Sequence, residues 1–260
     1  MTVNGKPPIS AFIRTKNESR LVADVVRAAF SVADEVVVVD SGSTDATIAL
    51  AQNEGARVIS REWLGSGRQK RFAEDQCKHD WLLDLDADEI MTPELADEIA
   101  ALFLNGEPPC NVYRTPIAIA PPFGAPWRGF GGVIRHKLYD RRIMRAPDHA
   151  AWDQFDPPPG SKVGTLRSSI LHFAYSDTSH LLRKVDTNSS VRAERLDPKP
   201  LPLLVLRIFF GLPFYVGKRY FLNGLFRAGV SGFSFSMISG FGRWLRDVKM
   251  YERLMREREK

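Results

Sequence analysis

The feature that most constrains the fold is a strand-like run of four consecutive valines, Glu35–Asp40 (EVVVVD). Successive side chains of a strand point to opposite faces of a sheet, so a strand with one face in water carries a polar residue at every second position. Four valines in a row leave neither face polar. The run therefore predicts a central strand of a parallel sheet that is covered on both faces.

Strand-like and helix-like segments alternate through the first hundred residues. Strands are predicted at Ile9–Ile13, Glu35–Asp40, Ala56–Ser60 and Trp81–Leu85. The helices predicted from apolar spacing and capping residues are Leu21–Ala29, Ala46–Glu54, Arg68–Cys77 and one that begins with Thr92 as N-cap and Pro93 at its first position. This order predicts an α/β fold with a doubly wound, mostly parallel sheet and right-handed crossovers.

The rest of the chain extends this sheet and then changes character. Gly131–Tyr139 and Lys162–Tyr175 are expected to add strands to a mixed extension of the sheet, and Ser179–Leu196 is expected to be helical. The chain is therefore predicted to hold two halves of one domain, residues 1–105 and 106–177, followed by a helical extension over residues 178–260.

Cysteine content and charge limit the class of protein. Cys77 and Cys110 cannot build a disulfide framework, and zinc-ligand spacing is absent, so we expect a reducing, cytosolic setting. The first ten residues lack an apolar core, so no secretory signal is expected. Residues 201–260 hold 11 Lys or Arg against 4 Asp or Glu. The basic excess of the chain therefore lies in this tail. Residues 1–200 are not expected to bind nucleic acid, and the tail is expected to contact an anionic surface.

The tail begins with an apolar stretch, Leu201–Val216, that is interrupted by Pro202, Arg207 and Pro213. It is expected to fall short of the ~18–20 clean residues that a spanning helix needs. Aromatic and basic residues alternate after it, a composition that suits helices lying in a membrane interface. A helical subdomain packed on the body, or an interface between copies of the chain, would have the same composition.

The run WLLDLDADE at 81–89 ends an apolar strand in Asp84, Asp86, Asp88 and Glu89. Carboxylates at the end of a buried strand cost folding free energy unless a positive charge neutralises them. A hard divalent cation coordinated by these carboxylates and by the phosphate oxygens of a substrate would supply that charge. Ligands of doubly wound sheets bind beyond the carboxyl ends of the strands. Two more polar clusters follow strands, RTKNE at 14–18 and DSGSTD at 40–45. The glycine-rich dinucleotide and P-loop motifs are missing from the sequence.

Together these motifs resemble the family 2 glycosyltransferases of the GT-A fold, and most of all the subgroup that adds a sugar to the inner core of bacterial lipopolysaccharide. The matching segments are RTKNE at 14–18, VVVVDSGSTDAT at 36–47, the stretch from Trp63 to Lys70, and WLLDLDADE at 81–89. The KRYF segment and the aromatic-basic tail after it are also similar.

The resemblance implies a metal-dependent, inverting transfer of a sugar from a nucleotide sugar, foremost a UDP-sugar, to a lipopolysaccharide-core or other lipid-linked glycan. It implies that residues 1–105 bind the donor, that residues 106–177 lie on the acceptor side, and that the tail contacts the inner face of the cell inner membrane. The oligomeric state stays open.

The resemblance also implies the roles of single residues. Asp88 would ligate Mg²⁺ or Mn²⁺, Asp86 would face the ribose or the metal, and Glu89 would orient the site or the acceptor. Such a cation stabilises the charge of the departing nucleoside diphosphate. The residues implied around the nucleotide are Thr15, Asn17, Glu18, Asp40 and, beside the diphosphate, Lys70.

The base that takes the acceptor proton is less clear from the sequence. The resembling subgroup has a His-Glu pair where this chain has Trp152 and Asp153. Asp153 is the candidate base and Asp156 the second choice. His172 ends a predicted strand, where it could approach the metal or diphosphate, although a satisfied semi-buried histidine is the favoured interpretation. Two other classes stay open at this point: a nucleotidylyltransferase, and a non-catalytic membrane-bound protein that binds nucleotide sugars.

Overall fold

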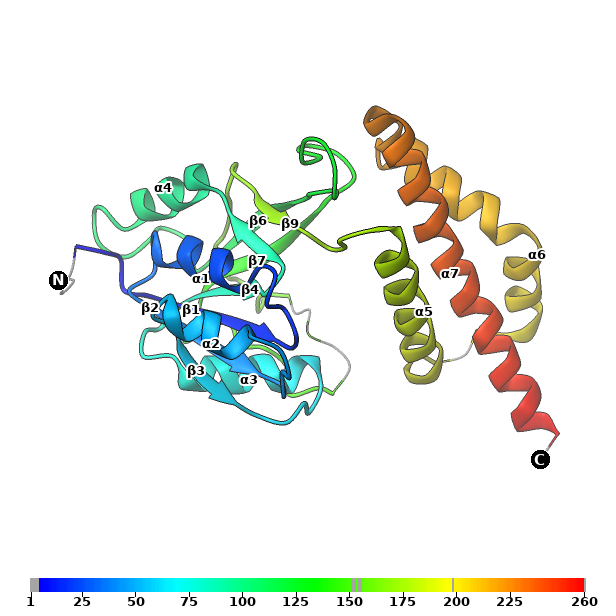
Figure 1. The fold of residues 1–260 in the computed structure, drawn as a ribbon, viewed down its shortest axis with the longest axis horizontal. Coiled ribbons are helices and arrows are strands. Elements are labelled where there is room, and N and C mark those ends of the chain that lie inside the picture. The colour runs from blue at the N-terminus through cyan, green and yellow to red at the C-terminus, as the bar shows by residue number, and fades with distance from the viewer. Residues whose placement is uncertain (1–4, 151–152, 154–155, 198, 260) are drawn as a thin grey trace. The chain divides into compact units, whose positions relative to one another are not determined.

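The structure is a computed structural model that describes residues 5–150, 153, 156–197 and 199–259. It divides into two compact units (Figure 1). Residues up to 118 together with 133–173 form the first, here called the sheet unit. Residues 119–132 together with those from 174 onward form the second, here called the helical unit. The functional division at residues 105 and 177 stays a prediction.

The sheet unit contains a mixed sheet with the order β3-β2-β1-β4-β7-β6-β9-β5, and β8 pairs with β6. The first four strands in this order are parallel, whereas β7 runs antiparallel to β4. The strands are β1 (Ile9–Thr15), β2 (Glu35–Asp40), β3 (Arg57–Ser60), β4 (Trp81–Asp86), β5 (Glu89–Met91), β6 (Val112–Ile119), β7 (Val133–Asp140), β8 (Val163–Thr165) and β9 (Ile170–His172). The predicted α/β fold with a mostly parallel, mixed sheet is confirmed.

The helices of the sheet unit are α1 (Val22–Phe30), α2 (Thr47–Asn53), α3 (Ser66–Gln76) and α4 (Pro93–Leu102). The predicted start of α4 is confirmed, because the Thr92 hydroxyl accepts a hydrogen bond from the Leu95 amide and Pro93 occupies the first turn. Two strands, β5 and β6, were not predicted. Pro116 disfavours a strand in a sequence, and it is tolerated here within an irregular pairing with β7.

The valines of β2 explain why that strand is central. Val36 and Val38 belong to the core cluster that α1 and α4 complete, whereas Val37 and Val39 belong to a second cluster that contains Ala73 of α3. All four valines are at most 1% exposed. Because both faces of the strand are covered, the prediction from four consecutive apolar residues is confirmed.

The helical unit contains α5 (Thr178–Arg195), α6 (Leu201–Gly217), a π-helical turn η1 (Lys218–Leu222), a 3₁₀ turn η2 (Leu225–Ala228) and the long helix α7 (Gly229–Arg258). Residues 119–132 join this unit through Trp127, which packs with Leu181, Leu225 and Phe235.

One expectation about the tail is wrong. Leu201–Leu222 forms 22 helical residues that include an 18-residue window of mean hydropathy 1.5, long and apolar enough by length and composition to cross a membrane. The reason is that helical structure continues through Pro213 and into η1 instead of ending at the proline. Length and composition do not establish that a helix spans a membrane.

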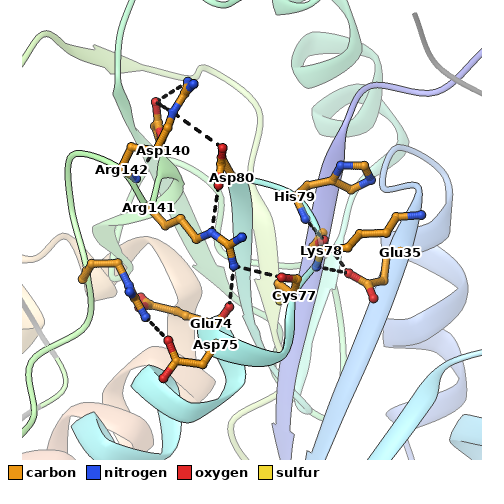
Figure 2. A network of polar contacts seen from close by, with 12 residues as sticks. Glu35, Glu74, Asp75, Cys77, Lys78, His79, Asp80, Asp140, Arg141 and Arg142 are labelled. Carbon is orange, nitrogen blue, oxygen red and sulfur yellow. Dashed lines mark hydrogen bonds and ion pairs between the residues drawn. The ribbon is translucent and has the colours of Figure 1, made fainter.

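A network of buried polar contacts fixes the end of α3. Glu74 of α3 is fully buried, and its carboxylate accepts hydrogen bonds from the Tyr139 hydroxyl (2.7 Å), the Arg145 Nε (2.6 Å) and the Ala146 amide (2.8 Å). Arg141, just after β7, donates to the carbonyls of Glu74 and Cys77 and to the Asp80 carboxylate (Figure 2). These contacts tie α3 to the loop that follows β7.

We predict that Glu74→Ala destabilises the fold by roughly 3–5 kcal/mol, because it leaves three donors without their acceptor in the interior. Asp75→Ala is the matched control: Asp75 is 53% exposed and pairs with the other end of Arg145, so its loss should cost about 1 kcal/mol or less. Urea unfolding measures both free energies. Equal losses in the two variants would contradict the role assigned to Glu74.

Candidate active site

Three strands of the sheet unit end at one edge. In the sheet register, Arg14 of β1 pairs with Asp86 of β4, and Thr15 of β1 pairs with Asp40 of β2. The chain then turns tightly from β4 to β5, where the Asp86 amide donates to the Glu89 carboxylate at 3.0 Å. The three polar clusters predicted from the sequence therefore share one edge, where parallel sheets bind their ligands.

A cavity of about 340 Å³ opens at this edge within the sheet unit. Four of the predicted site residues line it, namely Lys70, Asp86, Glu89 and Asp153. Further polar residues around it are Asp84, Arg135, His136, Lys137, Asp156 and His172. The other predicted residues, Thr15, Asn17, Glu18, Asp40 and Asp88, are absent from the described lining of this cavity.

Arg14 connects the acidic strand end to the candidate base. Its guanidinium lies 2.5 Å from the Asp86 carboxylate and 3.2 Å from the Asp153 carboxylate, and it donates to the Ser66 carbonyl at the start of α3. Partial burial works to raise the pKa of Asp86, but the charges of Arg14, Lys137 and Lys70 outweigh this effect and hold the pKa below its usual range. Asp86 is therefore a carboxylate at neutral pH.

Two buried ion pairs support the same cluster. Lys70 of α3 contacts the Asp84 carboxylate at 2.6 Å, with 8% and 2% of the two side chains exposed. Burial works to raise the pKa of Asp84, but Lys70 and Lys137 together hold it below its usual range. Lys70 thus neutralises an acid of β4 and also lies 3.8 Å from Asp153.

Lys137 of β7 forms the second pair, at 2.6 Å from the Glu89 carboxylate, with both side chains almost fully buried. Burial raises the pKa of Glu89, and the charge of Lys137 works against that rise. The Glu89 oxygen that meets Lys137 also accepts the Asp86 amide. Glu89 therefore holds the turn between β4 and β5.

The predicted metal ligand Asp88 contacts His172. The His172 imidazole is 3.3 Å from the Asp88 carboxylate, which is 14% exposed, and His172 sits opposite Glu89 in the pairing of β5 with β9. No set of three His, Cys, Asp or Glu side chains within the described ranges is arranged to enclose a metal ion. The donor set fits Mg²⁺ or Mn²⁺ of the kind that one or two carboxylates share with substrate phosphates, rather than a closed protein cage.

A second polar cluster lies at the ends of β1 and β2. Asn17 has a left-handed backbone (φ 54°), which asparagine tolerates better than most residues. Its side-chain oxygen accepts the Thr44 amide, and its own amide donates to the Ser43 hydroxyl. The Glu18 amide donates to the Thr47 hydroxyl. Asn17 and Glu18 thus join the loop after β1 to the loop after β2.

Asp40 and Thr15 differ in what their side chains contact. The Asp40 carboxylate is fully buried and accepts the amides of Gly42 and Ser43 and the Ser43 hydroxyl, so it closes its own turn. The Thr15 hydroxyl is buried and has no hydrogen-bond partner among the residues that the structure describes. An unpaired buried hydroxyl at a ligand-binding edge is a group that a ligand can satisfy.

The structure gives two residues contacts that were not predicted from the sequence. Arg14, part of the cluster at 14–18, contacts Asp86, and Lys137 of β7 contacts Glu89. Ion pairs between residues more than 40 positions apart cannot be derived from spacing. Trp152, which stands where the similar subgroup has histidine, lies outside the described residues.

We predict that Lys70→Met destabilises the protein by roughly 3–5 kcal/mol, because it leaves the Asp84 carboxylate buried without its cation. The double variant Lys70→Met/Asp84→Asn should recover most of this loss, since it removes the buried charge. Urea unfolding measures both. A stable Lys70→Met variant would show that Asp84 does not depend on Lys70.

The chain matches the family model described as Glycosyl transferase family 2 over residues 10–157. An uncharacterized glycosyltransferase of Rickettsia felis is 32% identical over 96% of this chain and 92% of its own length. The lipopolysaccharide core biosynthesis glycosyltransferase LpsC of Rhizobium meliloti is 30% identical over 95% of this chain and 93% of its own length.

Among solved structures, glucosyl-3-phosphoglycerate synthase of Mycobacterium tuberculosis in complex with Mg²⁺ and UDP is similar, with 26% identity and a TM-score of 0.34. That match covers 44% of this chain and 43% of the synthase. The family model covers more than half of the chain, and the two relatives match nearly all of it. The protein is therefore a member of glycosyl transferase family 2, a glycosyltransferase with a GT-A type mixed α/β sheet.

Proposed function

We propose that this glycosyltransferase transfers a sugar, with inversion, from a nucleotide sugar to a lipopolysaccharide-core or other lipid-linked glycan, and that the transfer depends on Mg²⁺ or Mn²⁺. A UDP-sugar is the proposed donor. The observation that carries the proposal is the ionic cluster at the sheet edge. In it, four carboxylates from Asp84, Asp86, Glu89 and Asp153 surround three cations from Arg14, Lys70 and Lys137.

The charge of this cluster supports a donor complex with a cation. The four carboxylates exceed the three cations, so a divalent cation adds favourable charge, and a diphosphate balances that cation in turn. Asp88, with Asp86 near it in the chain, would hold the metal. When bound, the metal would supply Lewis-acid stabilisation of the leaving diphosphate. Arg14 and Lys70 keep Asp86 and Asp84 ionised and supply positive charge at the same edge.

The open hydroxyl of Thr15 and the loops joined by Asn17 and Glu18 support a nucleoside pocket beside the cluster. The Asp40 carboxylate, which accepts two amides of its own turn, is proposed to line that pocket and to accept a hydrogen bond from the base ring. Glu89 is proposed to orient the acceptor side through its contacts with Lys137 and the Asp86 amide.

Asp153 is the proposed base. Its carboxylate is 29% exposed, lines the cavity and is held by Arg14 and Lys70. A carboxylate there can take the proton of an acceptor hydroxyl that attacks the anomeric carbon, while the bond to the nucleoside diphosphate breaks. Asp156 lines the same cavity and is the second choice.

Two observations support the proposed acceptor and location. The relative named for lipopolysaccharide core biosynthesis matches 95% of the chain, and the helical unit exposes many large apolar side chains. A lipid-linked acceptor at the inner face of the cell inner membrane suits both. Family membership disfavours the nucleotidylyltransferase, and the following experiment tests the non-catalytic alternative.

We expect the purified protein to release UDP from a UDP-sugar in the presence of Mn²⁺ and a lipid-linked glycan extract. Asp153→Asn should lower turnover by about 10²–10⁴-fold while donor binding is retained, because only proton removal is lost. Asp88→Ala should lower both turnover and metal-dependent donor binding. Coupled detection of UDP and calorimetric titration of donor measure the two effects.

Asp148→Asn is the matched control, since Asp148 belongs to the same loop but is 76% exposed and pairs with the exposed Arg68. Its turnover should equal that of the unchanged protein. Full activity of Asp153→Asn would move the base to another residue. Tight donor binding without UDP release, whatever the acceptor, would support the non-catalytic alternative.

A further inference from the structure

The first helix after α5 exposes an apolar stripe. Leu203, Leu206, Phe210 and Phe214 of α6 follow one another at intervals of three or four residues, and 44–69% of each residue is exposed. Phe209 beside them is 75% exposed. Soluble monomeric proteins seldom expose this many large apolar side chains side by side along one helix. The stripe therefore indicates a surface that something apolar covers.

The other side of α6 is held on α7 by a buried charge. Asp247 of α7 is fully buried and accepts hydrogen bonds from the Tyr215 hydroxyl (2.7 Å), Arg207 Nε (3.0 Å) and Arg246 (3.0 Å). At Gly240 of α7 the helices approach so closely that a Cβ would lie 3.0 Å from the backbone nitrogen of Val216. Removing one partner of such a cluster is costly, so α6 stays on α7.

Further large apolar side chains are exposed after α6. Exposed side chains follow in the two turns and along the start of α7, where they again recur every three or four residues. We call the whole set the apolar face; after the α6 stripe it contains Phe221, Leu222, Phe226, Val230, Phe233, Met237 and Phe241.

The charge of this segment indicates what covers the face. Residues 201–246 contain no Asp or Glu, and they contain six basic residues, Arg207, Lys218, Arg219, Arg227, Arg243 and Arg246. Lys218, Arg227 and Arg243 are exposed. Apolar side chains among basic ones, without a single acid, complement a surface that is hydrocarbon inside and anionic at its headgroups.

The positions of the charges decide how the helices enter a bilayer. A spanning α6 would carry Arg207, and with it Asp247 of α7, into hydrocarbon, and a hairpin inserted by its tip would carry Lys218, Arg219 and Arg227 there. Either arrangement costs several kcal/mol. With α6 parallel to the membrane plane, the phenyl groups enter the acyl region and the basic residues stay with the headgroups.

We propose that the apolar face docks this protein in the plane of an anionic lipid surface, with α6 lying flat and not spanning. The inference deepens the proposed membrane location and does not depend on the transfer reaction. Vesicle binding needs neither donor nor acceptor, so its failure and a failure of the proposed catalysis are distinguishable.

Flotation with vesicles of phosphatidylcholine, with and without phosphatidylglycerol, tests the surface. The unchanged full chain should bind the anionic vesicles, and Phe210→Asp/Phe214→Asp should bind about tenfold less or weaker still, because two phenyl groups no longer enter the bilayer. Leu104→Asp is the control, since Leu104 is 79% exposed in the sheet unit. Its binding should not change, and circular dichroism checks that each variant is folded.

A depth measurement tests the orientation. Phe210 lies near the middle of Leu201–Leu222, so a fluorophore on Phe210→Cys, in a chain with Cys110→Ser, reports where the centre of α6 sits. Burial raises the pKa of the Cys77 thiol to about 12, so that residue should stay unlabelled. Nitroxide lipids labelled near the headgroup should quench the probe more than lipids labelled at the acyl end.

Stronger quenching from the acyl end would overturn the in-plane arrangement in favour of a span. Unchanged vesicle binding by Phe210→Asp/Phe214→Asp would show that the apolar face is not the docking surface. The proposal would be overturned if the unchanged chain does not bind vesicles and sediments as a dimer, while the variant sediments as a monomer. That result would assign the apolar face to contact with a second copy of the chain.

Discussion

The sheet unit depends on the neutralisation of carboxylates that gather where β4 leaves the core. Asp84 and Glu89 are almost completely buried, and neither could stay ionised there without a cation in contact. Lys70 comes from α3 and Lys137 from β7, so each ion pair also ties a separate element to the strand end. The electrostatic requirement of the site and the packing of the sheet are thus met by the same contacts.

The helical unit uses the same physical device for another purpose. Asp247 is fully buried between α6 and α7, and its hydrogen bonds to Arg207 and Tyr215 leave one face of α6 turned outward. The inner face of α6 packs Leu204 and Ile208 against Met250 of α7 beside this buried charge, and its outer face exposes phenyl groups. The helix is therefore apolar on both sides, whereas an ordinary surface helix is apolar on one side only.

Strands and helices of the first hundred residues could be predicted because their signals are local. The valines of β2 are buried on both faces, and Thr92 caps α4 as its sequence indicates. The predictions failed where a local signal was overruled: β6 accommodates Pro116, and helical structure continues past Pro213. In both places the chain adopts a structure that the backbone preference of proline disfavours by a few kcal/mol.

The sequence by itself determined the class of fold, the family, and the clusters of polar residues that follow the strands, because each depends on neighbours in the chain. Only the tertiary structure decided which charges meet. Arg14 contacts Asp153 across 139 positions of sequence and also contacts Asp86, and His172 of β9 contacts Asp88 in the turn between β4 and β5. An ion pair requires side chains a few ångströms apart in space, and that distance is set by the register of the sheet rather than by spacing along the chain.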